Sequence, residues 1–75
     1  MADLRLHHLV YSGRALEEAS QAFAEVAEVE VRQQMPYFEV TLRAREADTD
    51  PEALRGEFAN YVLALTIEER RGGHR

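Results

Sequence analysis

The chain has 75 residues, a formal net charge of −5 and no cysteine. This length allows a single domain, and the absence of cysteine excludes disulfides and thiolate metal sites. The negative charge argues against nucleic acid as a partner, because phosphate binding requires clustered positive charge.

Two further limits follow from the length and from the apolar content. A chain this short buries only about 60% of the surface that its unfolded form exposes, so we expect oligomerisation or binding to a larger protein to add stability. The longest apolar stretch is about ten residues, whereas a membrane span needs roughly twenty. The start, "MADLRLHHLV", lacks the pattern of a signal peptide, and a cytoplasmic protein without a membrane partner is therefore expected.

The first predicted elements are a strand over residues 4–10, "LRLHHLV", and a helix over residues 15–28, "ALEEASQAFAEVAE". Alternation in the strand places one set of side chains on a common face: Leu4, Leu6, His8 and Val10. Ser12 and Gly13 predict the turn that follows. The helix is amphipathic, and its apolar side is formed by Leu16, Ala19, Phe23, Val26 and Ala27.

Residues 28–33 and 37–45 alternate at period two and predict two more strands. The inward side chains are Val29 and Val31 in the first, and Phe38, Val40, Leu42 and Ala44 in the second. The connection between them is too short for a crossover, so an antiparallel hairpin is expected.

The last predicted element is a helix over residues 51–71, which Asp50 caps and Pro51 begins. Residues 1–71 are therefore expected to form one α+β domain, followed by a flexible tail over residues 72–75. The predicted architecture is a two-layer β-α-β-β-α sandwich, in which both helices cover one face of a three-stranded sheet. The other face is expected to meet water through Arg5, Glu28, Glu30, Glu39, Arg43 and Arg45.

The final helix carries more apolar surface than the sheet can cover. One stripe is predicted to pack on the sheet: Leu54, Phe58, Tyr61, Val62 and Leu65. A second stripe, formed by Gly56, Ala59, Leu63 and Ile67, is left over. Exposed apolar surface of this kind usually marks a protein interface, and a compact monomer that buries both stripes is the alternative.

Asn60 lies beside the second stripe and either forms a hydrogen bond across an interface or faces water. The predicted partner-binding residues are therefore Gly56, Ala59, Asn60, Leu63 and Ile67.

The element order, the segment "YSGRALEEASQAF" and the helix "EFANYVLALTIEERR" resemble the small D protein of His-Xaa-Ser systems, the HxsD-like family. The last helix of that family carries a stretch of the type Leu-Leu-Asn-Asp-Tyr-x-Leu-Arg-Glu. Phe58, Ala59 and Asn60 resemble its opening, and residues 65–69 resemble its close. The resemblance implies an accessory role beside radical SAM enzymes that modify a peptide, and no enzymatic activity of its own. The implied partner is a maturation enzyme, with a peptide as a further candidate.

A second similarity concerns the fold alone. Pcc1-like subunits of the tRNA threonylcarbamoyladenosine complex share this element order and dimerise through helices. The alternative to an adaptor is therefore a structural dimerisation subunit of a larger complex.

No catalytic, cofactor-binding or metal-binding set is predicted. His7 and His8 are neighbours on a predicted strand, so their side chains are expected on opposite faces, where they cannot chelate one ion together. His74 lies in the predicted tail. Ser12 and Gly13 open a helix, whose N-terminus is able to bind an anion, but a plain turn is the favoured interpretation.

Three pairs of carboxylates are also candidates for chemistry: Glu17 and Glu18, Glu28 and Glu30, and Glu68 and Glu69. General acid–base catalysis needs such pairs in a dry pocket, whereas these are expected on solvated faces. The sequence therefore predicts a binding protein rather than an enzyme.

Overall fold

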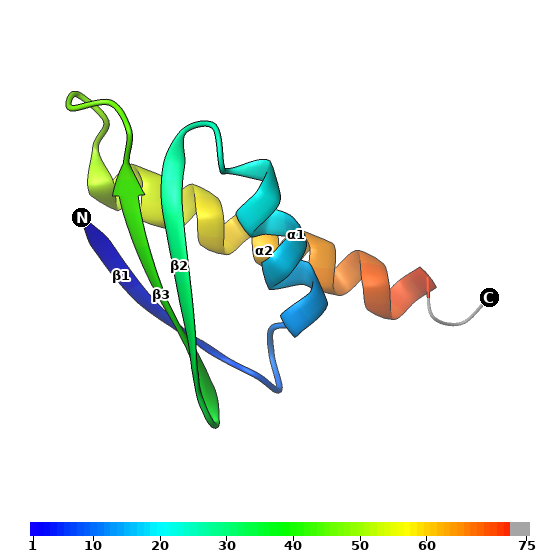
Figure 1. Cartoon of the computed structure of the whole chain (residues 1–75). Coiled ribbons are helices and arrows are strands. Elements are labelled where there is room, and N and C mark those ends of the chain that lie inside the picture. The colour runs from blue at the N-terminus through cyan, green and yellow to red at the C-terminus, as the bar shows by residue number, and fades with distance from the viewer. Residues whose placement is uncertain (73–75) are drawn as a thin grey trace.

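Five elements follow one another in the predicted β-α-β-β-α order, and the computed structural model describes residues 1–72 (Figure 1). They are β1 (Ala2–His7), α1 (Gly13–Ala22), β2 (Ala27–Gln34), β3 (Tyr37–Ala44) and α2 (Pro51–Gly72). The strands are antiparallel in the order β1-β3-β2, so β1 and β2 are both edge strands. Both helices lie on the same side of this sheet, which confirms the predicted α+β class.

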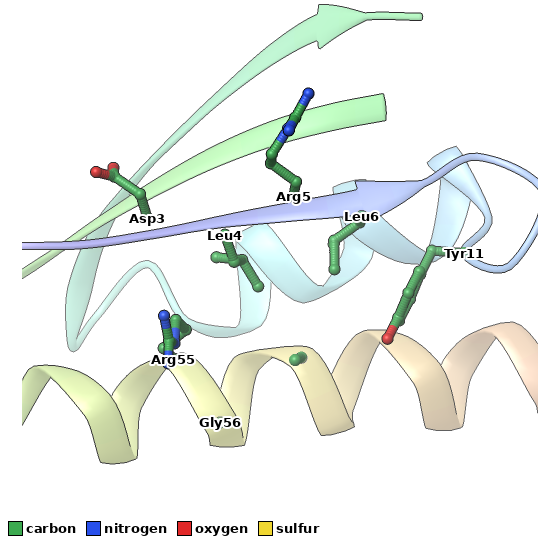
Figure 2. Close-up of a pocket in the computed structure, with 8 residues that line it drawn as sticks. Asp3, Leu4, Arg5, Leu6, Tyr11, Arg55 and Gly56 are labelled. Carbon is green, nitrogen blue, oxygen red and sulfur yellow. The ribbon is translucent and has the colours of Figure 1, made fainter. Parts of the chain in front are cut away.

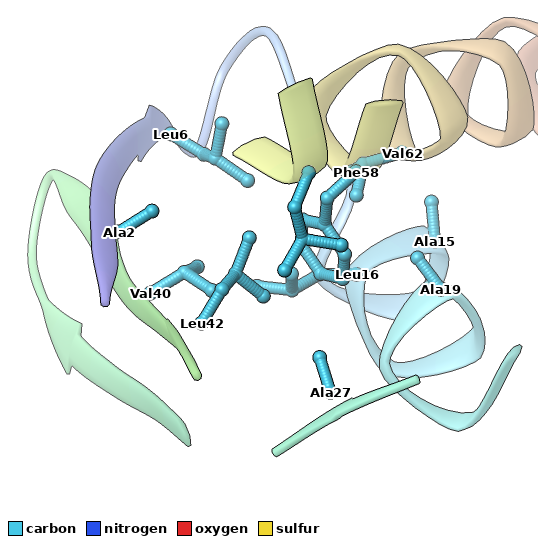
Figure 3. Packing of buried hydrophobic residues seen from close by; sticks show 11 residues of the cluster. Ala2, Leu6, Ala15, Leu16, Ala19, Ala27, Val40, Leu42, Phe58 and Val62 are labelled. Atoms are coloured by element: carbon cyan, nitrogen blue, oxygen red, sulfur yellow. The ribbon is translucent and has the colours of Figure 1, made fainter. Parts of the chain in front are cut away.

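The register of the strands separates an apolar face from a polar face. Leu4 lies opposite Val40, and Val29 lies opposite Leu42, so these side chains share the face toward the helices. Buried residues of this face and of both helices form the core (Figure 3). Its members are Ala2, Leu6, Ala15, Leu16, Ala19, Ala27, Val40, Leu42, Leu54, Phe58 and Val62.

The opposite face of the sheet is polar, as predicted, and several of its side chains interact across strands. The Thr41 hydroxyl donates a hydrogen bond to the Asp3 carboxylate over 2.9 Å. The Arg5 guanidinium lies 3.8 Å from the Glu39 carboxylate and 4.4 Å from the centre of the Tyr37 ring. This face is therefore stable in water without a covering layer.

The first strand differs from the prediction, because β1 runs from Ala2 to His7 rather than over residues 4–10. His8 and Val10, which were expected on a strand face, lie in a turn. The partner strand β3 begins at Tyr37, directly opposite His7, so the ladder stops after one further hydrogen bond, from the His8 N–H to the Pro36 carbonyl. The chain turns instead, and the Tyr11 N–H donates to the His7 carbonyl over 2.9 Å.

The first helix is shorter than predicted, since it ends at Ala22 rather than at residue 28. Ala27 pairs with Ala44 and begins β2, so sheet formation overrides the helical pattern of this segment. As a result Val26, which was expected on the apolar side of the helix, is 52% exposed. Val31 was expected to point inward, and it is 42% exposed in the middle of β2.

The final helix begins as predicted, with the Asp50 carboxylate accepting from the Glu52 N–H over 3.1 Å. It ends at Gly72, one residue beyond the predicted end, so residue 72 does not belong to a tail. The rest of the predicted tail, including His74, lies outside the described residues.

The buried stripe of α2 differs in part from the prediction. Leu54, Phe58 and Val62 are buried, as expected. Tyr61 was expected on the same stripe but is 42% exposed. Thr66, a polar residue, is fully buried instead. The four buried residues recur at every fourth position, so the buried face drifts around the helix toward Thr66 in the last turns.

Candidate functional site

The apolar stripe left over on α2 lies beside a free edge of the sheet. A groove of about 490 Å³ runs between β1 and α2. We call it the β1–α2 groove, and it is lined by Asp3, Leu4, Arg5, Leu6, Tyr11, Arg55, Gly56 and Ala59. Figure 2 shows Leu4, Leu6 and Tyr11 pointing from β1 and the following loop toward α2, while Asp3 and Arg5 point away from it.

The predicted partner-binding residues fall into two groups. Gly56 and Ala59 line the β1–α2 groove, and Leu63, one turn further along the same flank of α2, is half-buried. Ile67 is 47% exposed and lies outside the groove. Asn60 is exposed on the isolated chain, where it faces water, and a hydrogen bond from Asn60 across an interface stays a prediction.

The outer edge of β1 presents backbone groups to the groove. The His8 N–H donates to the Pro36 carbonyl over 3.0 Å, which continues the ladder between β1 and β3. Hydrogen-bonded pairs alternate along an antiparallel ladder, so Leu6, Leu4 and Ala2 direct their N–H and C=O groups toward β3. The intervening residues Asp3 and Arg5 therefore direct theirs outward. Within residues 1–72 no strand pairs with β1 on that side.

The loop that follows β1 is held against α2 by hydrogen bonds. The Thr66 hydroxyl donates to the Val62 carbonyl over 2.8 Å and accepts from the Ser12 N–H over 3.1 Å. The Ser12 hydroxyl donates to the Glu69 carboxylate over 2.8 Å. The Arg70 guanidinium donates to the Leu9 carbonyl over 2.8 Å. These contacts fix the end of the groove at which Tyr11 lies.

This arrangement also places a carboxylate at the N-terminus of α1. Ser12 is the N-cap, and its hydroxyl oxygen accepts from the N–H groups of Arg14 and Ala15. Because the same hydroxyl donates to Glu69, a carboxylate of the chain itself lies near the positive end of the helix. The cap was readable from the sequence, but the contact with α2 was not. Leu54, Phe58, Val62 and Thr66 recur at every fourth position, and this recurrence was the only sequence signal that Thr66 is buried against the loop.

The histidine pair differs from the prediction. The His7 and His8 rings are stacked, with centroids 5.3 Å apart, and do not lie on opposite faces. The reason is that β1 ends at His7, so strand alternation does not extend to His8. The His7 Nδ1 accepts from the Leu9 N–H over 3.1 Å. Within residues 1–72 no three His, Asp or Glu side chains are grouped so that they could hold a metal ion.

The candidate acid–base residues lie on the surface. Every glutamate except Glu39 is exposed, and this includes the three pairs that the sequence suggested. Glu28 forms an ion pair of 3.7 Å with Arg43 on the polar face of the sheet. Water therefore solvates these carboxylates, and the groove contains none that is buried.

Two findings concern the chain as a whole. No helix in the described residues is long and apolar enough to cross a membrane. The chain matches no protein-family model, no curated protein and no solved structure.

Proposed function

We propose that this protein is a non-enzymatic accessory or adaptor protein that acts by binding a protein chain at the β1–α2 groove. The candidate chains are a second copy of the protein, a maturation enzyme or the peptide which that enzyme modifies. The proposal rests on one observation: two surfaces that have no partner in the described residues, an edge of the sheet and an apolar flank of α2, lie side by side. The outward backbone groups of Asp3 and Arg5 lie beside the apolar flank formed by Gly56, Ala59 and Leu63.

An extended segment fits such a surface through two kinds of contact. Its main chain continues the sheet by hydrogen bonding to β1, and alternate side chains enter the groove toward α2. Gly56 and Ala59 leave space for those side chains, since a Cβ atom built on Gly56 meets no other atom within 4 Å. Main-chain pairing supplies affinity, and the apolar pocket selects which side chains are accepted.

The remaining chemistry supports binding over catalysis. General acid–base catalysis needs carboxylates in a dry pocket, and the glutamates here other than Glu39 are exposed and spread over both layers. A net charge of −5 does not favour nucleic acid. We therefore propose no cofactor and no metal for this protein.

The resemblance to the HxsD-like family narrows the proposal. In that role the protein would assist a cytoplasmic radical SAM enzyme that modifies a peptide of a His-Xaa-Ser system. The alternative is a Pcc1-like structural dimerisation subunit of a larger complex, which would use the same apolar flank of α2.

The test compares two substitutions on α2. Leu63→Glu places a charge on the groove flank, and Ala64→Glu is the matched control on the exposed side of the same helix. Each variant is co-expressed with a radical SAM enzyme and a precursor peptide of a His-Xaa-Ser system, and complex formation and peptide modification are measured. We expect Leu63→Glu to lose both and Ala64→Glu to keep both.

Equal behaviour of the two variants would contradict a function that depends on the groove. If the gene lies beside tRNA-modification genes and no radical SAM gene is present there, the dimerisation subunit becomes the favoured function in place of the adaptor.

A further inference from the structure

We infer that the chain which fills the β1–α2 groove is a second copy of this protein, paired antiparallel through β1 about a two-fold axis perpendicular to the sheet. This inference rests on the proposed function, because it names the partner of the same surface. The product is one continuous antiparallel sheet built from both copies, with all helices on one face.

The backbone of β1 determines which residues can pair. Only residues with outward N–H and C=O groups form hydrogen-bonded pairs with a new strand, and these are Asp3 and Arg5. When Asp3 lies opposite Arg5 of the second copy, and Arg5 opposite Asp3, about four backbone hydrogen bonds join the copies. Leu4 then lies opposite Leu4 of the second copy on the apolar face.

The charges of β1 select this register over its neighbours. A shift by two residues would place either Asp3 opposite Asp3 or Arg5 opposite Arg5, and like charges directly opposite are destabilising. A shift by one residue would pair a side chain of the polar face with one of the apolar face. In the register proposed here, the two copies together instead form two cross-strand pairs of opposite charge.

The helix layer fits the same arrangement. The two-fold axis brings the α2 helices of both copies side by side, with the groove flanks facing each other. Gly56 and Ala59 lie there, and small residues allow helix axes to approach within the usual 8–10 Å. Leu63 is thereby covered, which accounts for the part of the second apolar stripe beside the groove, whereas Ile67 stays outside it.

The other edge strand, β2, is the competing site. Glu30 and Arg32 lie two residues apart on the polar face and would also form pairs of opposite charge between copies, but their backbone groups point toward β3, so Val31 would form the hydrogen-bonded pair there. The groove beside β2 is lined by Ala24, Ala27 and Val29 together with Glu17, Ser20, Gln21, Glu28 and Arg45. A two-fold axis at β2 would bring the glutamates of this groove toward those of the second copy, whereas the β1–α2 groove contains no glutamate, so the structure favours β1.

The test is a charge exchange, followed by sedimentation equilibrium at tens of micromolar. The wild type should have twice the 8.6 kDa mass of the chain. Asp3→Arg alone and Arg5→Asp alone should weaken association about tenfold or more, because each places like charges opposite one another. An equimolar mixture of the two variants should associate again as a heterodimer, since every introduced charge then meets its opposite. The double variant should associate with itself for the same reason.

Matched controls lie on the other edge: Glu30→Arg and Arg32→Asp should associate as the wild type does. Circular dichroism checks that each variant is folded, and recovery in the mixture shows that the single substitutions did not damage the chain.

Three results would overturn the inference. Loss of association in the β2 variants, with the β1 variants unaffected, would place the interface at β2. A mixture that fails to associate, although both of its components are folded, would exclude the proposed register. A wild type that is monomeric yet binds the maturation enzyme, with Leu63→Glu losing that binding, would refute the second copy and leave the proposed function standing.

Discussion

Replacing Thr66 by valine tests the hydrogen bonds that hold the β1–α1 loop against α2. Thr66 is fully buried, donates to the Val62 carbonyl over 2.8 Å and accepts from the Ser12 N–H over 3.1 Å. Valine has nearly the same shape and a similar helix propensity, so the hydroxyl is the main difference between the two side chains.

The expected loss of stability follows from the groups that remain. The Val62 carbonyl keeps its ordinary helical partner, the N–H four residues later, and is not left without a donor. The Ser12 N–H does lose its acceptor, and an unsatisfied buried donor costs about 1–3 kcal/mol. Ser12 is only half-buried, and burying a methyl group in place of a hydroxyl offsets part of the cost. We expect the free energy of unfolding to fall by about 1–2 kcal/mol.

Urea unfolding followed by circular dichroism measures this loss, in the Asp3→Arg background because that substitution is expected to weaken association. Thr66→Ser is the control: it keeps the hydroxyl and loses one buried methyl group, which costs about 1 kcal/mol. Residue-resolved amide exchange separates the loss of the hydrogen bond from the loss of the methyl group. The Ser12 amide should exchange faster in Thr66→Val and at the wild-type rate in Thr66→Ser. Wild-type stability and wild-type exchange at Ser12 in Thr66→Val would refute the reasoning.

Three further outcomes are expected. Gly56→Ala in the same Asp3→Arg background should raise the free energy of unfolding by about 1 kcal/mol, because the glycine is inside a helix and its Cβ position is open. A loss of stability in urea titrations would mean that the site is crowded. Val62→Glu should unfold the chain, since an unpaired carboxylate in the core costs several kcal/mol, whereas Leu63→Glu should keep its circular dichroism spectrum and fail to associate. Unfolding of both variants would show that the flank is ordinary core. Added Zn²⁺ or EDTA should leave the melting temperature unchanged, because residues 1–72 group no three His, Asp or Glu side chains that could hold a metal ion. A shift at stoichiometric Zn²⁺ would reveal a site.

Local patterns in the sequence were sufficient for the element types and for the faces of β3 and most of α2. Side chains alternate along a strand and recur every three or four residues along a helix, so the faces of β3 and of most of α2 could be read without knowing their neighbours. The surplus stripe with Gly56, Ala59 and Leu63 was visible for the same reason. The number of apolar residues around α2 can be counted from its sequence alone, so a surplus of apolar surface can be recognised without the rest of the fold.

The ends of β1 and α1, the burial of Thr66 and the position of the groove were decided by the tertiary structure. β1 ends at His7 because β3 begins opposite it, and α1 ends early because Ala27 pairs with Ala44. Thr66 can be buried because its hydroxyl meets the N–H of Ser12, which is 54 residues away in the chain. The strand order β1-β3-β2 leaves β1 at an edge, and packing then brings α2 beside it. Each of these depends on contacts between distant segments, and no local period in the sequence encodes which segments meet.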